Sequence, residues 1–136
     1  MAKSVFPEQM MESSSGAMTL ESIAGKLDYF HLQLHLIHWQ THSIAEHEAV
    51  GSLYDYVHGF KDDVIEKLMG YTGKRPKAYK IEPLKEATSP EVVKDLSKFA
   101  YQLYLWAGEN DYCDVENMAQ ELSGKANKTL YLLTLS

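Results

Sequence analysis

The chain lacks most of the features that would place it outside the cell or in a membrane. Cys113 is its one cysteine in 136 residues, so no disulfide can form within the chain. A single thiol is typical of proteins kept in a reducing compartment. No apolar run approaches the roughly 20 residues that a membrane-spanning helix needs, and no apolar stretch of a secretion signal follows Lys3. We therefore expect a cytoplasmic protein without membrane contact.

Basic residues are also scarce. The chain has 13 lysines and arginines against 19 aspartates and glutamates, and its formal net charge is −6 with the histidines neutral. Because binding to a phosphate backbone depends on clustered basic side chains, we expect little or no binding to DNA. The length corresponds to a single domain that is large enough to bury a core.

The first 18 residues have little to bury. Pro7, the serines at 13 to 15 and Gly16 all lie in this segment. Such a composition predicts a disordered N-terminal tail over residues 1–18. Residues 19–136 are then expected to form the folded domain.

Apolar residues recur at helical spacing in four later segments. The predicted helices run from Leu20, after the N-cap Thr19, to about His42, from about Ala45 to Gly70, from the N-cap Ser89 to about Gly108, and from Asp111 or Asp114 to Leu133. A glycine inside a helix costs about 1 kcal/mol relative to alanine. Gly124 in the last helix therefore predicts close packing at that point.

Residues 71–88 separate the second and third helices. Gly73, Pro76 and Pro83 interrupt the helical pattern and predict an extended surface connection. At about 3.3 Å per residue the segment could reach ~50 Å, whereas a helix of about 25 residues is only ~37 Å long. The connection can thus run the full length of the molecule. These features predict an all-α, ferritin-like four-helix bundle with a long crossover between helices two and three.

Two histidines and two carboxylates form the most informative functional pattern. His38 and His47 flank the turn between the first two helices, and Asp62 and Glu66 lie one turn apart further along the second helix. Imidazole and carboxylate ligands together suit a divalent first-row metal such as iron. His47 and Asp62 should be about 22 Å apart on one helix. We therefore predict a metal site completed by two copies of the chain, one giving the histidines and the other the carboxylates.

The histidines of the first helix also fit a structural role. His31, His35, His38 and His42 share one narrow stripe of that helix. The stripe fits a ladder of metal ligands, but the polar flank of a bundle helix gives the same pattern.

Two alternatives concern the second helix. Asp62 and Glu66 also fit a solvated face between lysines. Within one chain, His31 should lie across from Asp55 and His58, whose spacing matches the carboxylate–histidine pairs of di-iron bundles. Because a second such pair is missing, the alternative within one chain is a mononuclear site for zinc or nickel.

The order of these motifs resembles a known family. The signature of the Dps proteins, the mini-ferritins, is similar to His38-Trp39, His47-Glu48, Leu53-Tyr54 and Asp62-x-x-x-Glu66 taken in sequence. The family's closing helix is similar to the segment from Asp114 to Glu121 and to Leu130-Tyr131. The resemblance extends from about Leu20 to Leu133.

The resemblance implies a ferroxidase centre at each two-fold contact between subunits. In that centre His38 and His47 are iron ligands from one chain, Asp62 and Glu66 are ligands from its partner, and Trp39 shields the site. The resemblance also implies a dodecameric shell that oxidises Fe²⁺ with peroxide or oxygen and stores ferric iron inside. We expect a di-iron or mononuclear iron site that also accepts zinc in vitro.

The sequence departs from the Dps pattern near the second histidine. The turn between the two histidines is shorter than in the family, and Gly51 stands where an iron-binding aspartate is expected. Glu48 and Asp55 are weaker candidates to replace that aspartate. The alternative function is therefore a Dps-like bundle that assembles but has lost ferroxidase activity.

Overall fold

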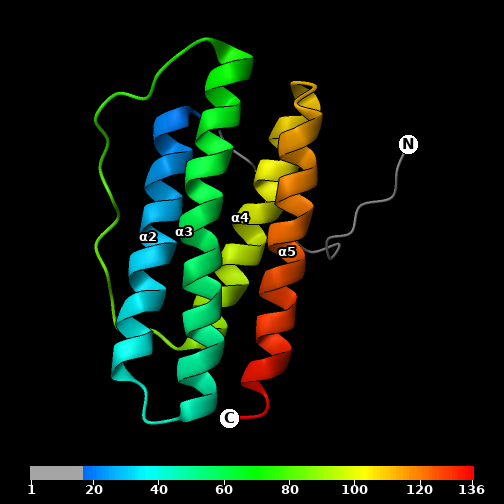
Figure 1. Ribbon diagram of the computed structural model, residues 1–136. Helices are drawn as coiled ribbons and strands as arrows, with labels where there is room; N and C mark the ends of the chain where they lie inside the picture. Colours follow the sequence, from blue (N-terminus) through cyan, green and yellow to red (C-terminus); the bar gives the residue numbers. More distant parts are fainter. Residues whose placement is uncertain (1–16) are drawn as a thin grey trace.

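The computed structural model describes residues 17–136, which form four helices and contain no strand (Figure 1). The helices are α2 (Leu20–Gln40), α3 (Ile44–Thr72), α4 (Ser89–Glu109) and α5 (Cys113–Leu133). The predicted all-α class and the four predicted helices are confirmed. The predicted tail lies outside the described residues except for its last two positions. No helix in the described part of the chain is both long and apolar enough to cross a bilayer.

Side-chain caps begin three of the four helices. Thr19 caps α2 within a reciprocal capping box, and Ser43 caps α3. The cap of α4 is Thr88. The prediction that Ser89 caps this helix was wrong, because Ser89 is buried and its hydroxyl donates to the carboxylate of Glu46 instead.

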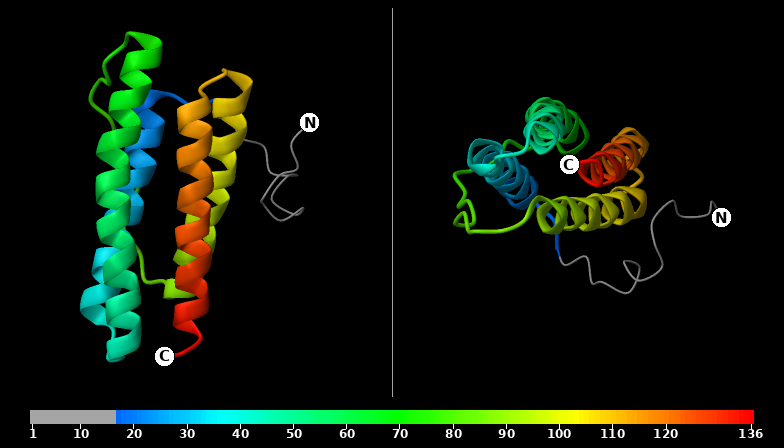
Figure 2. Two further views of the ribbon diagram at one scale, coloured as in Figure 1. Left: turned by 45° about the vertical axis from the view of Figure 1, so that its right-hand side comes forward. Right: turned by 90° about the horizontal axis from the view of Figure 1, so that it is seen from below.

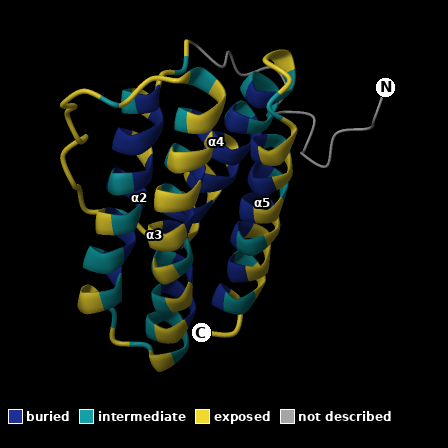
Figure 3. Cartoon of the chain, turned by 45° about the horizontal axis from the view of Figure 1, so that its top comes forward, coloured by how far each residue is buried: buried dark blue, intermediate teal, exposed yellow. Residues whose placement is uncertain are grey.

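The helices pack as two antiparallel pairs, α2 with α3 and α4 with α5, and α3 also lies beside α5 (Figure 2). Their buried faces meet in one apolar core (Figure 3). Complete burial of a leucine or phenylalanine contributes about 1.5–3 kcal/mol, and the largest core side chains include Phe30, Leu53, Leu96 and Leu122. The prediction that Gly124 packs closely against another helix of the same chain was wrong. This residue is exposed, and a Cβ there would have no neighbour within 4 Å.

The connection over residues 73–88 lies along the outer side of α2 (Figure 1). Near its start, the Lys77 N–H donates to the Glu21 carboxylate at 2.6 Å. Near its end, the buried side-chain amide of Gln33 accepts from the Lys85 N–H at 3.0 Å and donates to the Lys85 carbonyl at 2.8 Å. The connection is therefore attached to α2 by its backbone at two separate levels.

A glycine on α2 allows this close approach. A Cβ on Gly25 would lie 2.9 Å from the carbonyl oxygen of Lys80, too close for any other residue without a backbone shift. Three residues further along α2, the Asp28 carboxylate accepts hydrogen bonds from Tyr79 and from Lys61. The middle of the connection is thereby packed against α2 and, through Asp28, linked to α3.

Candidate metal centre

Two imidazole rings lie against each other beside the turn between α2 and α3. His38 is in the last turn of α2 and His47 is in the first turn of α3. Their ring centroids are 3.6 Å apart and their planes are inclined by 19°. His38 Nδ1 donates to the His47 carbonyl at 2.8 Å, and His47 Nδ1 donates to the His38 carbonyl at 2.9 Å. Each residue thus fixes the orientation of the other.

These hydrogen bonds determine which nitrogen carries the proton. A carbonyl oxygen can only accept, so each Nδ1 must be protonated, and in the neutral ring Nε2 keeps a lone pair. Neither Nε2 has a hydrogen-bond partner among residues 17–136. Histidines that bind metals usually donate their second ring N–H to a carbonyl or carboxylate in this way. The pair therefore presents two oriented imidazoles whose Nε2 atoms carry the lone pairs that metals bind.

The stacking also bears on the number of ions that the pair can hold. A metal–nitrogen bond of about 2.0–2.1 Å lies in the plane of the imidazole. The His38 and His47 rings are stacked with centroids 3.6 Å apart, and their planes are inclined by only 19°. No point therefore lies in both ring planes at bonding distance from a nitrogen of each ring. In this arrangement one ion cannot bind both His38 and His47, whereas two neighbouring ions can each bind one ring.

Gly51 provides the space for the His38 ring. A Cβ at position 51 would lie 3.0 Å from Cε1 and 3.1 Å from Nδ1 of His38. A side chain here would press on the His38 imidazole from α3, and the stacking and hydrogen bonds with His47 would oppose a shift of the ring. The glycine that replaces the expected aspartate is thus coupled to the position of the first histidine.

The turn between α2 and α3 is held by Glu46, the residue before His47. The hydroxyls of Thr41 and Ser89 each donate to one oxygen of its carboxylate. Its backbone N–H donates to the hydroxyl of Ser43 at 3.2 Å. Because Ser89 is the first residue of α4, these contacts link the start of that helix to the histidine pair.

Further rings extend the pair into a column between α2 and α3. Tyr54 lies at its centre, with centroid distances of 5.5 Å to His31, 4.5 Å to His35 and 5.2 Å to His38. His31 in turn lies 4.9 Å from His58. Five of the six histidines of the chain therefore belong to one continuous set of ring contacts.

Trp39 does not cover the histidine pair within one chain. Its ring lies 4.0 Å from that of His35, and the residue is 69% exposed. Any shielding of His38 and His47 by this side chain would therefore depend on a contact outside the single chain.

The predicted carboxylate ligands form a second, separate pair. Asp62 and Glu66 are both exposed on α3. A hydrogen bond with Asp62, together with the charge of that group, raises the pKa of Glu66 above its ordinary value of 4.5. Among the described residues, no group of three or more histidine, cysteine, aspartate or glutamate side chains is arranged to hold a metal. Within one chain the predicted histidine ligands and the predicted carboxylate ligands thus form two separate pairs.

Neither of the two weaker candidates forms a metal-binding group with the histidines of the described chain. Glu48 is exposed at the start of α3. Asp55 lines a groove of about 640 Å³ between α3 and α5, whereas His58, one turn later, contacts His31 on α2. The structure therefore brings His58, but not Asp55, to His31.

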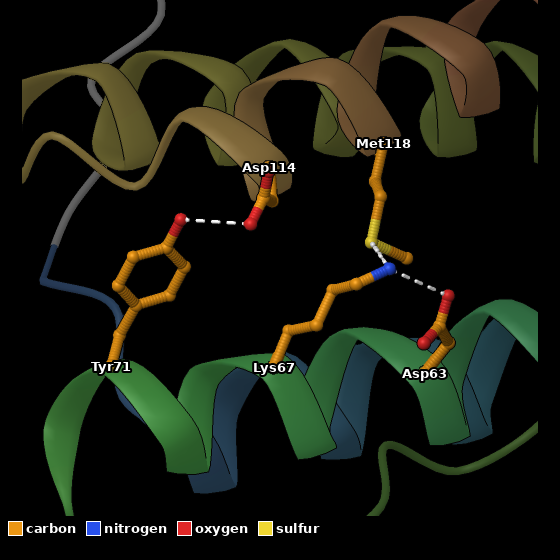
Figure 4. A network of polar contacts seen from close by, with 5 residues as sticks. All are labelled: Asp63, Lys67, Tyr71, Asp114 and Met118. Atoms are coloured by element: carbon orange, nitrogen blue, oxygen red, sulfur yellow. Dashed lines mark hydrogen bonds and ion pairs between the residues drawn. The ribbon is translucent and has the colours of Figure 1, made fainter.

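The same groove contains a network of polar contacts (Figure 4). The Lys67 ammonium lies 3.0 Å from the Asp63 carboxylate and 3.6 Å from the Met118 sulfur. The Tyr71 hydroxyl donates to the Asp114 carboxylate at 3.1 Å. These contacts join α3 to α5 and leave the histidine column on the opposite side of α3.

The fold and its half-buried histidine column define an all-α four-helix protein with a candidate metal centre. Residues 38–133 match the family model DUF5856, a family of unknown function. The chain belongs to this family, and the matched region includes the four predicted ligands. No curated protein and no solved structure matches the chain.

Sequence reasoning missed the features that orient the histidines. The spacing of the histidines on α2 indicates a shared face, but not the reciprocal hydrogen bonds between His38 and His47. It treated Gly51 only as a missing carboxylate. Glu46 gave no signal, because its contact with Ser89 joins residues 43 positions apart in the chain.

Proposed function

We propose that this protein is a Dps-like iron-binding protein that oxidises Fe²⁺ at sites shared by two copies of the chain and stores ferric iron in a homo-oligomeric shell. One observation carries the proposal above all others. His38 and His47 each have Nδ1–H bonded to a carbonyl and Nε2 free, as ligating imidazoles do.

The position of the second ligand pair supports a two-fold contact through α3. An antiparallel pair of α3 helices would bring His47 of one copy to Asp62 and Glu66 of the other if the axis passes near residues 55 and 56. Because α3 spans Ile44–Thr72, two copies would then overlap along most of the helix. A contact of this kind repeats itself on both sides of the axis, so each dimer would hold two equivalent sites.

The path of the chain supports the ferritin-like class. Ferritin-like bundles have one long crossover between the second and third helices of the bundle. The connection between α3 and α4 lies along α2 and is attached to it at Glu21 and Gln33. We propose that this connection is the equivalent crossover.

The chemistry requires the site to bind iron as a substrate and to hold two ions close together. The stacked rings of His38 and His47 suit one Fe²⁺ each. The carboxylates of Asp62 and Glu66 from the second copy would complete both coordination shells with oxygen ligands. Each Fe²⁺ loses one electron, and a peroxide molecule takes up both electrons and two protons to form two waters.

The first test is anaerobic addition of Fe²⁺ to metal-free protein, followed by peroxide or air, with ferric absorbance and column elution recorded together. We expect oxidation faster than in buffer and iron that elutes with the assembled protein. Glu66→Gln should abolish the fast phase, whereas Asp63→Asn, a change at a neighbouring carboxylate on α3, should preserve it.

Complementation between two inactive variants tests the shared site directly. His47→Gln and Glu66→Gln chains should each be inactive alone. In randomly reassembled mixtures half of the dimers are mixed, and each has one intact site of two, so about a quarter of the wild-type activity should return. Activity that never returns, in dimers shown to have mixed, would refute a site made by two chains.

A second function is favoured by Gly51. The missing carboxylate at this position, and the His38 ring that occupies its space, fit a bundle that keeps its assembly without ferroxidase activity. Oxidation no faster than in buffer, from an assembled protein with intact histidines, would support this alternative.

A further inference from the structure

A second pair of imidazoles lies further along the same helices. His31 on α2 and His58 on α3 have ring centroids 4.9 Å apart, with their planes inclined by 40°. His31 is half-buried and His58 is exposed. Neither ring has a hydrogen-bond partner among the described residues, and Tyr54 packs against His31 at 5.5 Å. Ring contacts alone therefore hold two imidazoles side by side with their nitrogens unbonded to protein.

The separation of these rings matches a single bridging ion. With metal–nitrogen bonds of about 2.0–2.1 Å, each ring centroid lies about 3.2 Å from the ion, so ligand angles of about 90–109° place the centroids about 4.5–5.2 Å apart. The observed 4.9 Å for His31 and His58 falls inside this range. The 3.6 Å between His38 and His47 falls outside it. The two histidine pairs are therefore suited to different binding modes.

The surroundings of His31 favour the form that binds metals. Burial, followed by the neighbouring His58, His35 and Lys61, lowers the pKa of His31, while the charge of Asp28 opposes this effect. The Lys61 ammonium is itself paired with Asp28, which limits its repulsion of a bound cation. A lower pKa favours the uncharged ring, which is the form that binds a metal.

We propose that His31 and His58 of one chain form a binding site for a late first-row divalent ion, with Cu²⁺ bound most tightly and Ni²⁺ and Zn²⁺ less tightly. Two imidazoles without a carboxylate favour these ions over Fe²⁺, and their order follows the general trend for nitrogen ligands. Water completes the coordination, since no third protein ligand is arranged there in the described part of the chain. The site needs no second copy and lies about 10 Å along α2 from His38.

The test is titration of the metal-free full-length protein with CuCl₂, followed by electron paramagnetic resonance for nitrogen ligands and by competition with a chelator. His58→Gln alters an exposed side chain, so it should fold normally by circular dichroism. Loss of a protein ligand should weaken Cu²⁺ binding at least about tenfold, since even changes in the residues behind a ligand cost about 10–100-fold. His31→Gln should give the same loss.

The controls separate this site from the proposed iron site. His42→Gln changes an exposed histidine of the turn that follows α2 and should leave Cu²⁺ binding unchanged. Glu66→Gln should also leave it unchanged, and His58→Gln should retain iron oxidation if the proposed function holds. Full Cu²⁺ affinity in His58→Gln, or a loss confined to His47→Gln, would overturn the assignment whatever the result with iron.

Discussion

The imidazole of His38 occupies the space that a side chain at Gly51 would need, because a Cβ there would lie 3.0 Å from its Cε1. The glycine and the histidine are on different helices, and each constrains what the other position can accept. This relationship makes an alanine substitution informative.

Gly51→Ala should stabilise the protein less than a matched change elsewhere. Alanine in place of an exposed helical glycine with free space, as at Gly124, should raise the free energy of unfolding by about 1 kcal/mol. At Gly51 the displaced His38 ring offsets that gain and loses its alignment with His47. Thermal unfolding and the His38 ring resonances would measure both effects. Equal stabilisation by the two substitutions, with unmoved His38 resonances, would contradict the prediction.

Gln33 should contribute far more to stability than Gln40, although both lie on α2 and bond to the connection. The Gln33 amide is fully buried and satisfies both the N–H and the carbonyl of Lys85. Gln33→Ala leaves these groups without partners, at a cost of about 2 kcal/mol. Gln40 bonds to Glu86 at the surface, and Gln40→Ala should change stability by less than about 0.5 kcal/mol. Denaturant unfolding of both variants is the measurement, and similar losses would show that the buried amide has no special role.

Tyr79 should titrate unusually late. Its hydrogen bond to Asp28, with smaller effects from burial and charge, raises the pKa of Tyr79 from 10.0 to about 12. The folded state therefore holds the phenolic proton more tightly, and the associated stability is present below pH 10 and lost as the pH rises towards 12. Nuclear magnetic resonance of the Tyr79 ring would record the titration. Asp28→Asn should return the pKa towards 10, and a pKa that does not move would exclude Asp28 as the cause.

His31 should make the metal-free protein less stable as the pH falls below neutrality. Burial, followed by the neighbouring His58, His35 and Lys61, lowers the pKa of His31 from its ordinary 6.5. Between 6.5 and the lower folded value the unfolded state binds more protons, so stability decreases as the solution is acidified through this window. Thermal unfolding with a chelator present would measure the slope. His31→Gln should reduce this dependence of stability on pH. His42→Gln, which changes a histidine that does not act on His31, should leave the contribution of His31 in place.

The parts of the fold that follow from local sequence patterns could be predicted. The apolar spacing from Leu20 onwards, the short turn after His42 and the proline-rich connection are local signals, and all four helices were expected near their observed positions. The N-cap of α4 is Thr88, one residue before the predicted Ser89, because the buried Ser89 hydroxyl donates to the Glu46 carboxylate and does not cap its own helix.

The candidate site was less accessible to such reasoning. Spacing alone showed that His47 and Asp62 cannot meet within one chain, and that His31 lies across from His58. The stacking of His38 on His47, however, depends on backbone carbonyls, whose directions are set by the packing of two helices. The pairing of histidine rings into two different geometries likewise depends on where Tyr54 and Gly51 lie, and residue type alone does not encode it.

The attachment of the connection at both ends has a consequence for how this family can vary. Surface connections usually tolerate insertions and deletions. Here Lys77 is bonded to Glu21 and Lys85 to Gln33, while Gly25 accepts the backbone of Lys80 between them. One residue more or fewer between positions 77 and 85 would put one of these contacts out of register. Relatives that keep these partners on α2 should therefore conserve the length of this segment, even where its sequence has diverged.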